Sequence, residues 1–220
     1  MPEQGMIRDG WIEVVVGCMF SGKSNEAAKR VEKEMFSRDR TVLIFTPRQG
    51  RRKVTITTNG KKQSNKNKLL SRAGKAFKAI EFDGGKPDQI ITRVKRTLAG
   101  GGKITTVAIE EGHFCAPELV RVCKTLAEKF MLRVIVMGLD KDFRNRGFGP
   151  VPGIMVDAER VSKELATCIK CGNPNANNSW LPPRFWNDLR DGNQLPGDAF
   201  EPTCRICYHK LVEKYGLPPE

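Results

Sequence analysis

The stretch "GCMFSGKS", residues 17–24, decides the fold of this 220-residue chain. It places Gly17, Gly22, Lys23 and Ser24 at the spacing G-x-x-x-x-G-K-S, which is typical of a loop that binds nucleotide phosphates. The apolar run "WIEVVVG" before it predicts a buried strand, and apolar residues at helical spacing follow it. The sequence therefore predicts the strand–loop–helix setting that the motif requires, with ATP or GTP as the ligand.

Each residue type in this loop has its own chemical task. Gly17 and Gly22 let the backbone turn tightly and present N–H groups inward, and the next helix adds the positive end of its dipole. Lys23 would reach the β- and γ-phosphates, and the Ser24 hydroxyl would bind Mg²⁺. We also count Ser21 among the predicted phosphate-binding residues. The alternative, a Gly-rich turn without a ligand, fits this context poorly.

Strands alternate with helices along residues 1–165. Continuous apolar runs predict parallel strands in "RTVLIF" (40–45), "KITTVAIEE" (103–111) and "LRVIVMGLD" (132–140), and one more in "GIMVDAERV" (153–161). Helical patterns occupy "LLSRAGKAF" (69–77), "KPDQIITRVKRTLAGG" (86–101) and "APELVRVCKTLAEKF" (116–130). This order predicts an α/β domain with a P-loop NTPase-like parallel sheet flanked by helices, and a separate small lobe over residues 166–220.

Basic residues are concentrated in one segment. The net charge is +13, and eleven Lys or Arg residues but no Asp or Glu lie from Pro47 to Ile80. We interpret residues 47–68 or so as a flexible basic insertion that contacts the phosphates of a nucleotide or of nucleic acid. The alternative is a solvated loop without a ligand. Only Phe77 is present for base stacking, which is little support for recognition of a particular single strand.

The sequence lacks the signals of a membrane or secreted protein. No apolar run reaches the length of a membrane span, and the N-terminal "MPEQGMIRDG" has no signal-peptide pattern. We therefore expect a cytoplasmic protein. The seven cysteines are an odd number, which argues against a disulfide framework.

Two carboxylates end one predicted strand, in "VAIEEGHF" (107–114). Strand alternation would point Glu110 and Glu111 in different directions, so we expect different roles. Glu110 would help hold Mg²⁺ beside the phosphate loop, and Glu111 would accept a proton from an attacking hydroxyl. The alternative is a pair of solvated loop charges. His113, one of two histidines, is more simply explained as a structural residue.

Four cysteines form two C-x-x-C knuckles, "CIKC" and "CRIC", separated by 32 residues. Four thiolates suit a structural Zn²⁺ without an open coordination position. We therefore predict that Cys168, Cys171, Cys204 and Cys207 bind zinc and clamp both ends of the loop between them. Redox pairs and buried thiols are the alternatives, and we expect Cys18, Cys115 and Cys123 to be ordinary buried or half-buried thiols.

With these motifs in order, the chain resembles thymidine kinases of the zinc-containing P-loop type, the type II family, from about Trp11 to Tyr208. The family pattern G-P-M-F-S-G-K-S-T-E is matched by "GCMFSGKSNE", and D-E-[AG]-Q-F-F by "EEGHFC". L-D-x-x-F with a following F-G is matched by "GLDKDFRNRGFG". "AERVSKELATCIKC" and "DAFEPTCRICY" match the two zinc-knuckle segments.

The resemblance implies transfer of the γ-phosphoryl group of ATP to the 5′-hydroxyl of thymidine, a step of deoxynucleoside salvage that requires Mg²⁺. It implies Glu111 as the catalytic base, assisted by Lys23. It also implies a zinc-ribbon-like lasso domain and tail over 166–220, a homotetramer, and inhibition by thymidine triphosphate. The nucleoside pocket would be lined by Met19, Phe114, Leu139, Phe143 and Phe200.

The chain departs from the family pattern on both sides of the expected site. Glu110 and Gly50 each replace an Asp, and His113 replaces a Gln. In the lasso, Phe200 replaces a Tyr, and Leu195 and Pro196 replace a Gly-Gly pair. Two other interpretations therefore stay open. One is a kinase with another pyrimidine preference, such as deoxyuridine. The other is a P-loop nucleotide-binding protein derived from such a kinase, which binds nucleic acid or a nucleoprotein partner through its basic segment.

Overall fold

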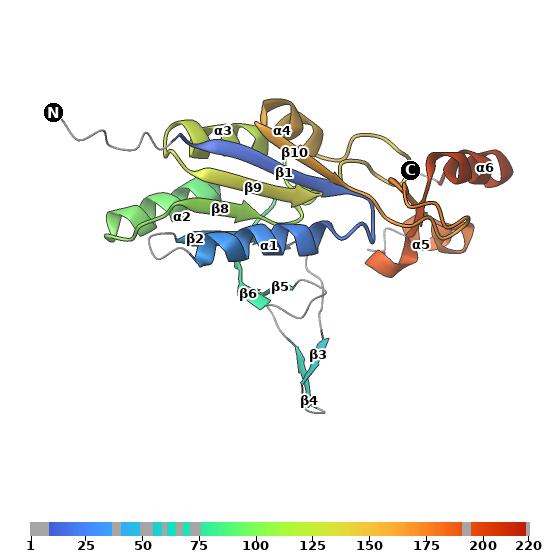
Figure 1. Ribbon diagram of the computed structural model, residues 1–220, viewed down its shortest axis with the longest axis horizontal. Coiled ribbons are helices and arrows are strands. Elements are labelled where there is room, and N and C mark those ends of the chain that lie inside the picture. The colour runs from blue at the N-terminus through green and yellow to red at the C-terminus, as the bar shows by residue number, and fades with distance from the viewer. Residues whose placement is uncertain are drawn as a thin grey trace.

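A parallel sheet of six strands organises the part of the chain that the computed structural model describes, residues 9–36, 41–48, 55–58, 61–64, 68–70, 76–190 and 195–218. The strand order is β10-β1-β9-β8-β2-β7, and all neighbouring strands run parallel (Figure 1). The predicted α/β fold is confirmed. The strands are β1 (Trp11–Gly17), β2 (Val42–Pro47), β7 (Ile80–Phe82), β8 (Thr106–Ile109), β9 (Arg133–Gly138) and β10 (Arg160–Glu164).

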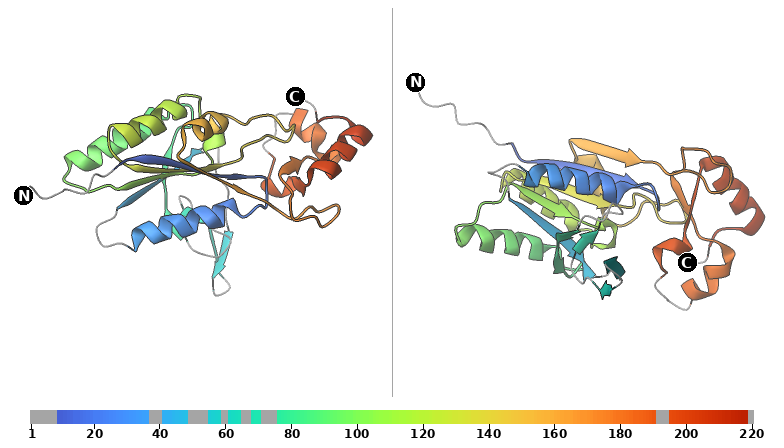
Figure 2. Two further views of the ribbon diagram at one scale, coloured as in Figure 1. Left: turned by 45° about the horizontal axis from the view of Figure 1, so that its top comes forward. Right: turned by 60° about the horizontal axis from the view of Figure 1, so that its bottom comes forward.

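Helices cover both faces of this sheet (Figure 2). One face packs against α2 (Asp88–Ala99), α3 (Leu119–Glu128) and α4 (Val151–Asp157), and the other against α1 (Lys23–Met35). Along the central strands, alternate side chains point to opposite faces of the sheet. Val14 packs in the core beneath α2, α3 and α4, the first core, and Val15 packs in the core beneath α1, the second core. Burial on both faces explains why these strands read as continuous apolar runs in the sequence.

The strand order places the predicted site residues at one edge of the sheet. Strand β9 lies between β1 and β8, and all three end at this edge. Because neighbouring strands are about 4.8 Å apart, the ends of β1 and β8 are separated by roughly 10 Å. The loops that follow β1 and β8 therefore lie on either side of the end of β9.

The C-terminal elements form a second lobe beyond this edge (Figure 2). Its antiparallel pair β11 (Asn178–Trp180) and β12 (Glu201–Thr203) packs with α6 (Arg205–Tyr215). The buried ring of Trp180 lies 5.8 Å from the ring of Tyr208 in α6, measured between centroids. Between β11 and β12 the chain forms η3 (Pro183–Phe185), α5 (Trp186–Arg190) and η4 (Gly197–Ala199). The predicted domain boundary between residues 165 and 166 stays a prediction.

Two sequence-based assignments were wrong. The helix expected over residues 69–77 is replaced by β5 (Lys68–Leu70), which pairs antiparallel with β6 (Ala76–Lys78). The apolar run over 153–161 is mostly the helix α4, and strand β10 begins only at Arg160. A short apolar run fits a helix or a strand equally well, so tertiary pairing decides between them.

The basic insertion expected over about residues 47–68 is described only in part. It contributes β3 (Thr55–Thr58) and β4 (Lys61–Ser64), which form an antiparallel pair. Gly50 and most of the remaining insertion lie outside the described residues, so its flexibility stays a prediction. Among the helices that the structure does describe, none has the length and apolarity needed to cross a bilayer.

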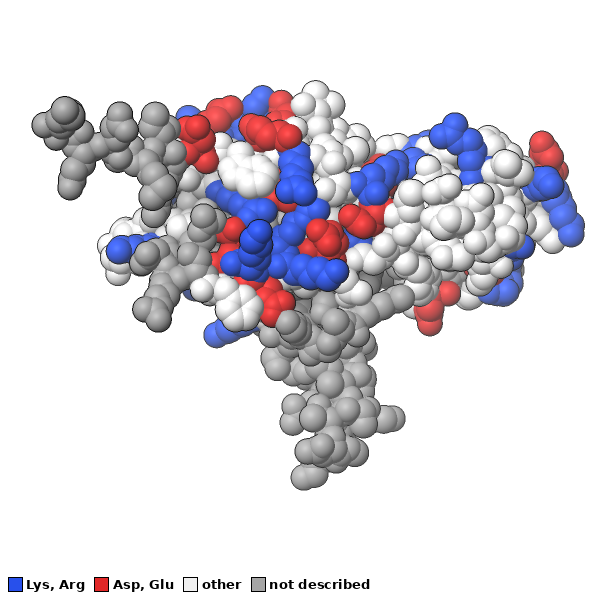
Figure 3. All heavy atoms as spheres, in the orientation of Figure 1, with Lys and Arg blue, Asp and Glu red and all other residues white. Residues whose placement is uncertain are grey.

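A buried ion-pair network joins α1 to the sheet. Glu13 of β1 has a side chain with no solvent exposure, and it accepts hydrogen bonds from Arg30 of α1 and Arg133 of β9. Arg133 also pairs with Glu34, whose carboxylate accepts a hydrogen bond from Thr106. Figure 3 shows acidic and basic side chains interspersed where α1 lies along the sheet. The network therefore fixes α1, and with it the loop that precedes α1.

We expect Glu13→Gln to lower the free energy of unfolding by about 3 kcal/mol, at the low end for a broken buried ion pair, because Arg30 and Arg133 keep Glu26 and Glu34 as counter-charges. Urea denaturation measures the change. Glu26→Gln is the matched control: Glu26 pairs with the same Arg30, but its side chain is 31% exposed, so the expected cost is about 0–1 kcal/mol. Equal effects of the two substitutions would contradict the assigned role of Glu13.

Candidate active site

The predicted phosphate loop connects β1 to α1 at the carboxyl edge of the sheet. Gly17 ends β1 with a φ of 152°, and a Cβ here would lie only 2.3 Å from the carbonyl oxygen of Glu164 in β10. Gly22 caps α1 with a φ of 86°, in the left-handed region. Glycine is therefore required at both positions, for space at Gly17 and for backbone conformation at Gly22.

The polar side chains of this loop are largely withdrawn from solvent. Lys23, the first residue of α1, is buried with Nζ 3.5 Å from the carbonyl oxygen of Cys18. Ser21 Oγ is buried and has no hydrogen-bond partner among the described atoms. Ser24 is half-buried in the first turn of α1, where backbone N–H groups have no intrahelical acceptor. An ammonium group, an unpartnered hydroxyl and a helix N-terminus together fit a phosphate group.

The second lobe contacts the phosphate loop directly. Met19 donates its backbone N–H to Ser179 Oγ at 3.0 Å, and the Cys18 thiol donates to the carbonyl oxygen of Ala176 at 3.3 Å. Burial raises the pKa of Cys18, which keeps the thiol protonated as a donor. Met19 also lies against the predicted lasso, because a Cβ at Gly197 would lie 2.8 Å from Met19 Cε. The shape of the phosphate loop therefore depends on residues about 160 positions further along the chain.

The two carboxylates lie in a turn, not in the strand. Strand β8 ends at Ile109, so strand alternation does not set the orientation of Glu110 and Glu111 as the sequence argument assumed. Glu111 has φ 48° and ψ 41°, which is uncommon for a non-glycine residue, and begins the 3-10 turn η2 (Gly112–Phe114). Glu111 is buried, whereas Glu110 is half-buried. Such backbone conformations cluster at functional sites, which is consistent with separate roles for the two residues.

The residues predicted to line a nucleoside pocket fall into two groups. Phe114 and Leu139 adjoin the acidic turn, since both contact the imidazole of His113. Phe143 and Phe200 lie at the second lobe with ring centroids 6.1 Å apart, and Met19 contacts the same lobe through Gly197. Leu139 and Phe143 belong to the loop after β9, so this loop links the two groups.

Charged residues of the same loop had no role in the sequence-based interpretation. Asp140 is buried, and its Oδ2 lies 2.5 Å from Lys163 Nζ of β10. Lys141 donates from Nζ to Asn178 Oδ1 of β11 at 2.8 Å. Burial and the nearby Lys163 cation lower the pKa of Lys141. These contacts tie the loop after β9 to the sheet edge and to the second lobe. The "GLDKDF" motif marked this loop in the sequence, but it did not show the partners.

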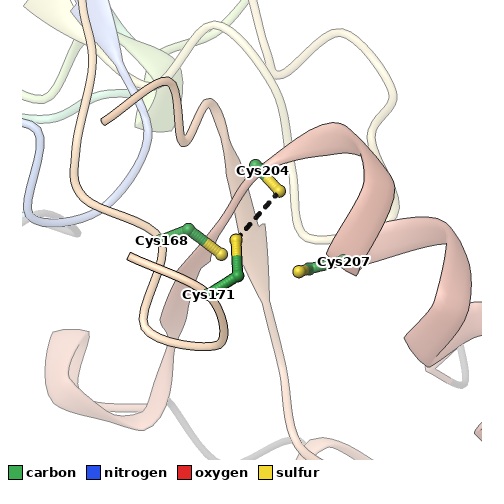
Figure 4. Close-up of side chains that lie close together, drawn as sticks. All are labelled: Cys168, Cys171, Cys204 and Cys207. Carbon is green, nitrogen blue, oxygen red and sulfur yellow. Dashed lines mark hydrogen bonds between the residues drawn. The ribbon is translucent and has the colours of Figure 1, made fainter. Parts of the chain in front are cut away.

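The four knuckle cysteines converge on one point (Figure 4). Their Sγ atoms all lie within 4.8 Å of one another, and those of Cys171 and Cys204 are 3.8 Å apart. A tetrahedral site with Zn–S bonds of about 2.3 Å requires sulfur–sulfur distances of about 3.8 Å. The cluster therefore has the size of a zinc site. Two ligands come from the turn after Leu165, one caps α6, and one lies in its first turn.

The surroundings of Cys168 favour a metal-binding thiolate. Burial alone would raise the pKa of Cys168, but backbone N–H groups of Cys204, Lys170 and Cys171 and the Cys171 thiol lower it to about 6. Hydrogen bonds with the neighbouring cysteines raise the pKa of Cys207 to about 12. A bound Zn²⁺ would displace the protons of the thiols, because zinc binds the thiolate form.

The other cysteines are buried thiols, as expected. Cys115 and Cys123 are buried in the first core, and burial raises the pKa of Cys115 to about 12. Cys18 packs beside the zinc cluster but belongs to the phosphate loop. Among the described residues, the four knuckle cysteines are the only cluster with the geometry of a metal site.

The comparison with protein families agrees with this arrangement. The family model described as thymidine kinase matches residues 10–208. The match spans the phosphate loop, the acidic turn, the loop after β9 and both cysteine knuckles, which are the segments that the fold brings together.

We expect one Zn²⁺ per chain, measured by elemental analysis of the purified protein. Cys168→Ser should abolish zinc binding because it removes a ligand, and limited proteolysis should then cut first between Asn173 and Pro202, while the sheet domain stays intact. Cys115→Ser is the control, since this buried thiol lies outside the cluster and its loss should leave the zinc content unchanged. Native protein purified without chelators and found free of zinc would contradict the assignment.

Proposed function

This chain belongs to the thymidine kinase family, and from that starting point we propose that it transfers the γ-phosphoryl group of ATP to the 5′-hydroxyl of thymidine, giving thymidine monophosphate. That it is a nucleoside-phosphorylating enzyme follows from the family; the donor, the acceptor and the roles of individual residues are the proposal. The observation that carries it is the placement of the phosphate loop and the acidic turn on either side of the end of β9.

The phosphate loop supports the role of phosphate binding. Its backbone N–H groups and the α1 N-terminus would receive the phosphate oxygens, with Ser21 Oγ as a further donor. Lys23 would place its ammonium group on the β- and γ-phosphates. Ser24 and Glu110 would hold Mg²⁺, which neutralises charge on the phosphates when bound.

Glu111 would serve as the general base. Its carboxylate would accept the proton of the 5′-hydroxyl while that oxygen forms a bond to the γ-phosphorus and the bond from the γ-phosphorus to the bridging oxygen of ADP breaks. The proton then passes from Glu111 to solvent, and thymidine monophosphate and ADP leave. Burial of Glu111 in a tight turn supports this role, because the turn fixes the backbone from which the side chain extends.

The second lobe would complete the nucleoside pocket. Phe143 and Phe200 would contact the base from the lobe, and Met19, Phe114 and Leu139 from the sheet domain. The zinc cluster anchors both ends of the segment that carries Phe200, so this segment can close over the nucleoside without losing its attachment. Closure would exclude water, which otherwise competes with the 5′-hydroxyl for the phosphoryl group.

Three further features belong to the proposal because they rest on family membership alone. We propose a homotetramer, feedback inhibition by thymidine triphosphate, and a cytoplasmic role in deoxynucleoside salvage. The other interpretation, a former kinase that binds nucleic acid through its basic segment, has less support. The phosphate loop, the acidic turn and the four clustered cysteines support the kinase, whereas only the charge of the basic segment supports the other interpretation.

We expect Glu111→Gln to reduce kcat for thymidine by about 10²–10⁴-fold with nearly unchanged ATP binding, because it removes the base and keeps the shape. Lys23→Ala should lower kcat/KM for ATP by about 10²–10³-fold through the loss of charge on the phosphates. A transfer assay with labelled ATP and a panel of nucleosides measures both. The exposed Glu118→Gln and Lys29→Ala are matched controls that should keep wild-type activity. Near wild-type turnover of Glu111→Gln would refute the assigned base.

Replacing basic residues of the insertion with Gln separates the two interpretations. The set is Arg51, Lys53, Lys61, Lys62, Lys66 and Lys68. In a kinase, thymidine phosphorylation at saturating ATP should change by less than about threefold, and polynucleotide binding should be weak and fall steeply with salt. Arg52 stays unchanged because it matches a family position. An unaltered protein that transfers no phosphate to any nucleoside, yet binds a polynucleotide tightly at physiological salt, would support the nucleic-acid binder instead.

A further inference from the structure

The imidazole of His113 is held in one orientation beside the acidic turn. His113 is 3% exposed, and its ring lies 4.2 Å from the ring of Phe114 and 4.7 Å from that of Phe148, measured between centroids. The end of β9 also packs against the ring, since a Cβ at Gly138 would lie 3.0 Å from His113 Nδ1. These contacts therefore leave the ring little freedom to turn.

The hydrogen bond at Nδ1 determines where the imidazole carries its proton. The backbone N–H of Leu139 donates to His113 Nδ1 at 3.0 Å. A ring nitrogen that accepts a hydrogen bond has no proton of its own, so we infer that the neutral ring is protonated at Nε2. Nε2 lies 3.4 Å from Glu111 Oε2, and both side chains are almost completely buried. Nε2 is therefore within 3.4 Å of a carboxylate oxygen of Glu111, close enough for its proton to reach that oxygen after a small movement.

A hydrogen bond from His113 Nε2–H would orient the carboxylate of Glu111. The last torsion of a Glu side chain has a broad preference, so the backbone turn alone does not fix the plane of the carboxylate. A neutral N–H donor fixes that plane without adding a positive charge. The distance of 3.4 Å is long for a hydrogen bond, but catalytic hydrogen bonds often shorten when substrate binds.

We propose that His113 is a positioning residue that acts through Glu111: the Leu139 N–H sets the imidazole tautomer, and the Nε2 proton orients the carboxylate for proton transfer. This inference rests on the proposed role of Glu111 as the base. It also connects the base to Leu139, a residue predicted to line the nucleoside pocket. The competing explanation is that His113 only fills space between Phe114 and Phe148.

The two explanations predict different activities for a variant that keeps an aromatic ring at residue 113 but lacks the Nε2–H donor. His113→Phe keeps an aromatic ring and removes Nε2–H, and His113→Gln keeps an N–H donor on a side chain of another shape. Positioning predicts that His113→Phe lowers kcat by about 10–100-fold, with KM for thymidine and for ATP within about threefold of wild type. His113→Gln should then retain kcat within about fivefold of wild type. Space filling predicts the opposite order.

A double-mutant cycle with Glu111→Gln tests whether His113 acts through Glu111. If it does, adding His113→Phe to Glu111→Gln should lower kcat by less than about twofold further. If the two substitutions lower kcat by the product of their separate effects, or if His113→Phe alone keeps the wild-type kcat, the inference is wrong. Either result leaves the proposed function unaffected. A wild-type enzyme that transfers no phosphate to thymidine, or a Glu111→Gln variant with full activity, would instead overturn the proposed chemistry and this inference with it.

A folding defect is separated from a positioning effect by thermal unfolding and ATP binding of each variant. The inference expects both to stay close to wild type in His113→Phe. His113→Met, which also lacks a donor but is unbranched and adaptable, serves as the second variant. If neither variant folds, or if kcat falls only in proportion to the folded fraction, His113 is a packing residue and the inference is wrong.

Discussion

At the end of β1, the backbone of Gly17 passes so close to β10 that no side chain fits between them. This close approach turns the chain out of the sheet and sets where the phosphate loop begins. The loop in turn places α1, whose buried ion pairs with β1 and β9 fix it across one face of the sheet. Gly22 then opens α1 with its N-terminus directed at the loop. A methyl group at residue 17 would disturb all of these elements together.

The strand order gives this loop its chemical partners. With β9 between β1 and β8, the loop and the acidic turn stand on opposite sides of one strand end rather than against each other. In the proposed reaction the loop would bind the phosphoryl donor, and Glu111 would receive the proton of the acceptor hydroxyl from the other side of this strand end. The loop after β9 contacts the acidic turn through Leu139, β10 through Asp140 and the second lobe through Lys141.

The second lobe is part of the site and not an appendage. Ser179 and Ala176 accept hydrogen bonds from the phosphate loop, and Asn178 accepts one from the loop after β9. These three residues lie between the two cysteine knuckles. Zinc, by holding the knuckles together, would therefore also hold the partners of the phosphate loop. This explains physically why a structural metal site stands so close to a site for phosphoryl transfer.

Local patterns in the sequence determined the phosphate-loop motif, most of the sheet strands and the two cysteine pairs that the fold brings together, because each depends on residue spacing along a short segment. They failed where one segment suits two structures: residues 69–77 have a helical pattern, but β5 and β6 pair as strands. The sequence pair Asn59-Gly60 is a hairpin signal that agrees with the antiparallel pairing of β3 and β4. Only the tertiary structure decided that β9 lies between β1 and β8, that Ser179 reaches Met19, and that the Leu139 N–H donates to His113 Nδ1 beside Glu111. Such contacts join residues distant in sequence, and their geometry depends on how loops cross the sheet edge, which no local spacing encodes.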